Sequence, residues 1–129
     1  MTVFLIVAQN GFRDEEYFKP KAVLEEAGYQ VKTGSTDYFT DKTALKLAAG
    51  AYQKNKVVGA ICIAPGILAR SGILKGKRAT VFPGEIETLK REGAVYVALP
   101  VVVDGRIVMA DGPEAAEEFG KTLVKIPGL

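Results

Sequence analysis

A stretch near the middle of the chain, residues 56–69, most constrains the fold, because it predicts a buried strand that runs directly into a helix. Residues 57–61 form an apolar run with β-branched members, which is typical of a strand buried on both faces. The run ends at Cys62, and Pro65 follows at a position that suits the first turn of a helix. A strand that stops at a nucleophilic residue and turns sharply into a helix is a nucleophile elbow.

Cys62 is the only cysteine in the chain, and its role has two interpretations. A lone cysteine in an apolar run is often a small buried hydrophobic residue at the end of a strand. At an elbow, the partial positive charge of the following helix instead favours the thiolate, which places the pKa of Cys62 below the usual value of about 8.5. We therefore expect Cys62 to be a reactive thiol in a strained backbone conformation with positive φ.

The composition narrows the classes of function and location. The chain has no histidine, which excludes Cys–His and Ser–His–Asp catalysis and most zinc sites, so we expect no metal and no cofactor. A net charge of only +2, with basic residues scattered among acids, gives no electrostatic footprint for nucleic acid.

One cysteine excludes an internal disulfide and favours a reducing compartment. No apolar run is long enough to cross a membrane, and a strand beginning at Thr2 leaves no room for a signal peptide, so we expect a cytoplasmic protein.

Predicted strands and helices alternate along the rest of the chain. Strands are expected at 3–8, 29–33, 57–61, 78–82 and 95–97, and helices at 14–27, 42–53, 67–74, 85–92 and 113–124. Pro20 lies within the first of these helices and predicts a kink or a late start. Residues 34–37 are expected to form a loop. An antiparallel hairpin is predicted over 101–109, because Asp104-Gly105 lies between two β-branched runs and favours a type I′ turn.

This alternation predicts a single α/β domain over residues 1–129, a three-layer sandwich with a mainly parallel sheet in which strands 3–8 and 57–61 lie together. Ligand sites in such folds lie beyond the carboxyl ends of the strands. Cys62 ends one strand, and Glu16 follows the turn after another. The topology therefore places Glu16 and Cys62 at the same edge of the sheet.

Several motifs resemble those of the ThiJ/PfpI superfamily, whose members include archaeal intracellular proteases and the Parkinson-associated deglycase. The resemblance covers nearly the whole chain and is carried by residues 60–65, 74–80, 103–108 with Gly112-Pro113, and 11–16 with Pro20 and 26–28. It implies a flavodoxin-like fold and an assembly of several copies. An oligomer interface is one possible place for Tyr17, Phe18 and Tyr38, and the core is another.

The resemblance also implies two site residues. Cys62 matches the family's reactive cysteine, and Glu16 matches the acid that hydrogen-bonds the cysteine sulfur. A protonated Glu16 that donates to the Cys62 thiolate would favour ionisation of the thiol. On the residues alone, Glu16 is equally consistent with a solvated acid at a helix start, a role that Asp14 or Glu15 would also fit.

Three departures from the family pattern bear on the chemistry. Ile63 stands where the protease branch carries a histidine, and Phe82 stands where the deglycase branch carries one before its proline. The family also has one more strand before the helix that begins near Lys42, and this strand ends in a Gly-Gly loop whose amides form an oxyanion hole. Here residues 33–37 run almost directly into 38–41, so either the strand is deleted or the sequence omits a segment. A true deletion predicts that strand 57–61 pairs directly with strand 3–8.

These features favour an enzyme in which the Cys62 thiolate attacks a reactive aldehyde or a glycated adduct while Glu16 shuttles the proton. A second possibility is a redox-sensing or protein-protective module without turnover, because an exposed thiol of low pKa oxidises readily. Intracellular peptidase activity ranks third, since no subunit of this chain can supply a histidine base.

Overall fold

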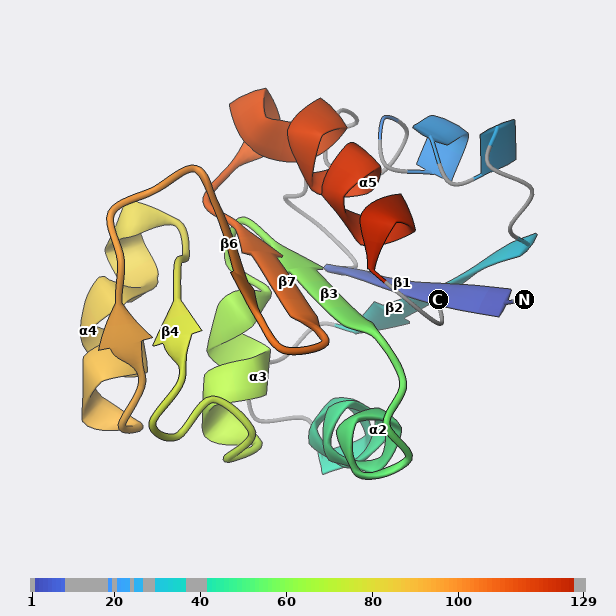
Figure 1. The fold of residues 1–129 in the computed structure, drawn as a ribbon. Helices are drawn as coiled ribbons and strands as arrows, with labels where there is room; N and C mark the ends of the chain where they lie inside the picture. Colours follow the sequence, from blue (N-terminus) through green and yellow to red (C-terminus); the bar gives the residue numbers. More distant parts are fainter. Residues whose placement is uncertain are drawn as a thin grey trace.

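The structure, a computed structural model, describes residues 2–8, 19, 21–23, 25–26, 30–36 and 42–126 (Figure 1). Its strands are β1 Thr2–Ala8, β2 Gln30–Thr36, β3 Val58–Ile61, β4 Arg78–Ala79, β5 Val95–Tyr96, β6 Val101–Asp104 and β7 Ile107–Ala110. Its helices are α2 Lys42–Gln53, α3 Pro65–Arg70, α4 Ile86–Arg91 and α5 Ala116–Lys125, with short 3-10 turns at Pro83–Glu85 and Pro113–Ala115. Residues 19, 21–23 and 25–26 are helical, in agreement with the predicted first helix, whereas the expected kink at Pro20 lies outside the described residues.

Most strand pairs are parallel, as the sequence predicts for this α/β fold. β1 pairs with β2, β3 with β7, and β4 with β5, all in parallel, while β6 and β7 form the predicted antiparallel hairpin. None of the helices in this described portion is long and apolar enough to cross a membrane.

Helices cover both faces of the β3–β7 pair, which gives the three predicted layers (Figure 1). Alternate residues of a strand point to opposite faces. Accordingly, Ile107 and Met109 belong to a core that includes α2 and α3, whereas Val108 and Ala110 belong to a core formed with Phe119 and other α5 side chains. This division accounts for the uninterrupted apolar runs of both strands, because neither face is exposed to water.

Gly59 allows α5 to lie close against β3. A Cβ atom at this position would come within 3.0 Å of both Phe119 and Leu123, which are themselves almost fully buried. The small residue in the predicted strand is therefore required by the distance between the α5 layer and the sheet.

β1 and β3 contact each other, but among the described strands no hydrogen-bonded ladder joins them. The prediction that these two strands share one sheet is therefore wrong for the described strands, and the direct pairing expected if a strand is truly deleted is not formed. Each strand is held by its own partner, β2 or β7. Closing a gap left by one absent strand would need one half of the sheet to shift by about 4.8 Å against the other, along with the helices packed on it.

Several element boundaries differ from the predicted ones. β2 extends to Thr36 and takes in residues predicted as loop, because β1 pairs with all seven of its residues. α3 covers Pro65–Arg70 instead of residues 67–74, and Gly72, with φ of +88°, lies just beyond its end. β4 stops at Ala79, before Phe82, whose backbone N–H bonds the elbow instead.

The β6–β7 turn also differs from the prediction. Asp104 pairs with Ile107, so the two central residues are Gly105 and Arg106, and only Gly105 has a positive φ. That pattern is typical of a type II′ turn and not of the predicted type I′ turn. Asp104 stays in the strand, where its carboxylate accepts a hydrogen bond of 2.9 Å from the backbone N–H of Arg78 and links the hairpin to β4.

Candidate active site

The backbone of Cys62 is left-handed, with φ of +63°, directly between the end of β3 and the turn into α3. This confirms the predicted positive φ. For a residue other than glycine, such a conformation costs of order 1–3 kcal/mol, so the surrounding structure must hold the Cys62 backbone in place. Two backbone hydrogen bonds do so, because the Cys62 N–H donates to Ala110 O at 2.9 Å and the Cys62 carbonyl accepts from the Phe82 N–H at 2.8 Å.

The turn after Cys62 is tight and leads into a buried helix. The Ala64 N–H donates to Ile61 O, and the Gly66 N–H donates to Ile63 O. Pro65 occupies the first turn of α3, as predicted, and residues 65–69 are all buried. α3 has only six residues, so its dipole favours a thiolate less than a long helix would.

The Cys62 residue is half-buried. This exposure differs from that of the core residues around it, such as Ala60 and Leu68, which are buried. Partial exposure favours the interpretation of Cys62 as an accessible thiol over its interpretation as a small buried hydrophobic residue at the end of a strand.

Phe82 lies beside the elbow through its backbone bond to Cys62, and the residue is 44% exposed. The structure therefore brings to Cys62 the residue that stands where the family's deglycase branch carries histidine. A phenyl ring can neither accept nor donate a proton, so Phe82 supplies no general base.

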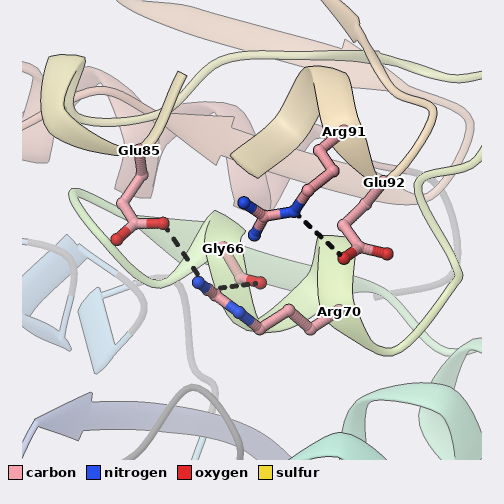
Figure 2. Close-up of polar contacts among 5 residues, drawn as sticks. All are labelled: Gly66, Arg70, Glu85, Arg91 and Glu92. Carbon is pink, nitrogen blue, oxygen red and sulfur yellow. Dashed lines mark hydrogen bonds and ion pairs between the residues drawn. The ribbon is translucent and has the colours of Figure 1, made fainter. Parts of the chain in front are cut away.

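An ion pair joins the two segments that flank the elbow. Figure 2 shows Arg70 of α3 reaching Glu85 in the turn after Phe82, at 3.5 Å, and Gly66 O, at 3.4 Å. Both side chains are about four-fifths buried. The pair fixes α3 against the segment that carries Phe82 and leaves little net charge on this side of the site.

Asp111 is a neighbour of the elbow that the sequence-based analysis missed. It directly follows Ala110, whose carbonyl accepts the Cys62 N–H, and its own N–H donates to Pro100 O at 3.0 Å. Burial, together with the charge of Glu114, raises the pKa of the half-buried Asp111 above that of an ordinary aspartate, against a lowering by a hydrogen bond from its own backbone. The sequence predicted the hairpin that precedes Asp111 but not which of its strands lies beside β3, so no sequence signal placed Asp111 at the elbow.

Glu16 and the alternatives Asp14 and Glu15 lie outside the described residues, so the contact between Glu16 and the Cys62 sulfur stays a prediction. Within the described part of the chain, no group of three or more His, Cys, Asp or Glu residues is arranged to hold a metal ion.

A mainly parallel sheet, helices on both faces and a left-handed residue between a strand and a helix define an α/β protein with an elbow. Residues 33–126 match the model of the DJ-1/PfpI family. The chain belongs to that family, as the sequence motifs suggested.

The chain is similar to proteins with and without a named activity. The uncharacterized protein MJ0967 of Methanocaldococcus jannaschii is 38% identical over 95% of this chain and 80% of its own length. Deglycase PYRAB04690 of Pyrococcus abyssi is 31% identical over 67% of this chain, which spans only 52% of the deglycase. Among solved structures, a ThiJ/PfpI domain protein from Brachyspira murdochii has a TM-score of 0.89 at 22% identity over 97% of this chain and 95% of its own.

The alignments also bear on the segment predicted to be missing. The match to the M. jannaschii protein runs over 165 residues, whereas 95% of this 129-residue chain is only about 123, so about 40 aligned positions have no counterpart here. An Archaeoglobus fulgidus protein, aligned over 161 residues with the same share of this chain, gives a similar excess. These relatives therefore contain internal sequence that this chain lacks. Residues 37–41, next to which the deletion was inferred, lie outside the described residues.

Proposed function

We propose that this DJ-1/PfpI-family protein is a cysteine-dependent enzyme that acts on reactive aldehydes or glycated adducts. The observation that carries the proposal is the left-handed backbone of Cys62 at a strand–helix junction, held by hydrogen bonds to Ala110 and Phe82. Strain of this kind is kept where it exposes a reactive group. The relatives named deglycase support the class of substrate.

The proposed first step is addition of the thiol to a carbonyl group. The Cys62 thiol gives its proton to Glu16, and the thiolate then forms a carbon–sulfur bond to the aldehyde carbon. The carbon–oxygen π bond breaks, and its oxygen takes the proton back from Glu16. The product is a hemithioacetal, so atoms and charge balance with no other reactant.

The absence of histidine places all of the proton transfer on Glu16 in this scheme. Phe82, whose backbone N–H donates to the Cys62 carbonyl, has no side-chain group that can transfer a proton. We therefore expect turnover to be slower than in a site with both an acid and an imidazole, where general acid–base catalysis typically contributes roughly 100- to 10,000-fold.

A redox-sensing or protein-protective module is the second candidate. The Cys62 residue is half-buried and not sealed in the core, and oxidation of a thiol needs neither a base nor an oxyanion hole. Peptidase activity ranks third, because hydrolysis of an amide needs a base and oxyanion donors that the sequence does not supply.

The test is whether methylglyoxal is consumed catalytically. The enzyme proposal predicts that the wild-type protein removes many equivalents of methylglyoxal and that Cys62→Ala and Cys62→Ser remove none above the uncatalysed rate. Loss of a single equivalent, with a mass increase confined to Cys62, would instead establish the module without turnover.

A homo-oligomer in the cytoplasm, with no nucleic acid or membrane partner, completes the proposal. The implied assembly is the feature to measure, by light scattering of the purified full chain. A monomer at micromolar concentration would remove the oligomer from the account and leave the chemistry of Cys62 unaffected.

A further inference from the structure

The ladder between β3 and β7 places Asp111 next to the elbow in the backbone register. Ile61 pairs with Ala110, so the residues that follow them, Cys62 and Asp111, leave neighbouring strands at the same edge of the sheet. The 2.9 Å bond from the Cys62 N–H to Ala110 O fixes this arrangement. Adjacent strands lie about 4.8 Å apart, so Asp111 begins within one strand spacing of the cysteine.

The Asp111 carboxyl group forms no ion pair with any cation in the described part of the chain. Among the described residues, neither Asp111 nor Glu114 takes part in an ion pair, whereas Glu85, on the other side of the elbow, is paired with Arg70. Asp111 is also partly withdrawn from water, which is the main reason that its pKa is raised. A partly desolvated carboxylate is less screened than an exposed one, so its field acts more strongly on nearby groups.

We propose that Asp111 sets the charge selectivity of the Cys62 site, so that neutral or cationic carbonyl compounds are accepted and anionic ones, such as α-keto acids, are disfavoured. The proposal rests on the proposed function for the identity of the substrate, but the field itself acts on any reagent that approaches the sulfur. An anion within several ångströms of Asp111 is repelled, whereas an uncharged aldehyde of the same size is not.

The test uses the single cysteine as a probe and needs no turnover. Rates of Cys62 alkylation are measured at pH 8 with neutral iodoacetamide and with anionic iodoacetate, for the wild-type protein and for Asp111→Asn. We expect the rate ratio of iodoacetamide to iodoacetate to fall roughly 3- to 10-fold in Asp111→Asn, which corresponds to about 0.7–1.4 kcal/mol of repulsion by one nearby charge. A change in the thiol pKa alters both rates equally and cancels in the ratio.

Glu87→Gln is the matched control, because it removes one carboxylate from α4 where the side chain is 87% exposed. The ratio should not change in this variant. Glu114→Gln should lower the ratio less than Asp111→Asn does, because Glu114 is exposed and more strongly screened. A ratio that is the same in Asp111→Asn as in the wild type, or that falls equally in Glu87→Gln, would overturn the proposal.

A second measurement covers the case in which Asp111→Asn does not fold. In the wild-type protein, added salt should raise the iodoacetate-to-iodoacetamide rate ratio more than it does for the free thiol N-acetylcysteine amide, because salt screens the repulsion by Asp111 as well as that by the thiolate itself. The same salt dependence of the ratio in the protein and in the free thiol would contradict the proposal. If methylglyoxal turnover is absent but the charge effect is found, the proposed function fails and this inference stands.

Discussion

At the scale of single residues, the strained backbone of Cys62 was predicted from the sequence, whereas its neighbour Asp111 was not. The positive φ of Cys62 followed from the order of strand, cysteine and proline, since few backbone paths join a buried strand to a helix so abruptly. Asp111 was missed because its role depends on which strand lies beside β3, and this pairing is set by tertiary packing. The partner proposed for the sulfur, Glu16, rests on family resemblance alone.

The strain at Cys62 predicts an unusual order of stability between two variants. Cys62→Gly should be more stable than Cys62→Ala by about 0.5–1 kcal/mol, because glycine adopts positive φ without the steric cost that alanine pays. At most ordinary sites within a strand or helix, glycine is the less stable of the two. Urea unfolding of both proteins measures the difference, and a more stable Cys62→Ala would mean that the left-handed backbone costs nothing.

At the scale of elements, hydrophobic pattern predicted the presence of strands and helices better than their ends. α2 has the predicted bounds of Lys42–Gln53, because an apolar stripe and a suitable start agree there. The end of α3 and the type of the β6–β7 turn were predicted less well. Gly72, just beyond the end of α3, has a positive φ, and Asp104 accepts a hydrogen bond from Arg78, which is distant in sequence. The ends of strands and helices depend on such contacts, which periodicity does not contain.

Two glycine substitutions test the layer arrangement. Gly59→Ala should destabilise the protein by about 1–3 kcal/mol, because the added methyl group meets Phe119 and Leu123 at 3.0 Å. Gly50→Ala is the control: it lies in α2 with no atom within 4 Å of the added carbon, and it should stabilise the protein by about 0.5–1 kcal/mol. Chemical denaturation of the two variants checks both signs, and a neutral Gly59→Ala would argue against close packing of α5 on β3.

At the scale of the whole molecule, the main departure from two relatives is about 40 internal aligned positions that this chain lacks. The family and the α/β layers were predictable because motifs and alternation extend over the whole chain. The separation of β1 from β3 was not predictable. A sequence does not reveal whether two strands that become neighbours when sequence is absent between them form a hydrogen-bonded ladder. The fold of the B. murdochii relative is nevertheless kept over 97% of this chain.

The division between β1 and β3 predicts a difference in amide exchange within β3. The N–H groups of Val58 and Cys62 donate to Arg106 and Ala110, so those of Gly59 and Ile61 face the opposite edge, where none of the described strands forms a ladder. We expect the Gly59 and Ile61 amides to exchange at least roughly tenfold faster than that of Ala60. Equal protection along the strand, measured by NMR, would show that another strand covers this edge.

The central claim is that Cys62 is an activated thiol whose reactivity depends on Glu16, and the pH profile of its alkylation tests this most directly. Iodoacetamide rates are measured for the wild type and for Glu16→Gln, in which a neutral amide can neither accept nor release a proton. We predict that wild-type alkylation stays fast at mildly acidic pH, well below the usual thiol pKa of about 8.5, and that Glu16→Gln has a different profile. Ordinary thiol titration in both proteins, with identical rates, would show that Cys62 is structural and would contradict the account.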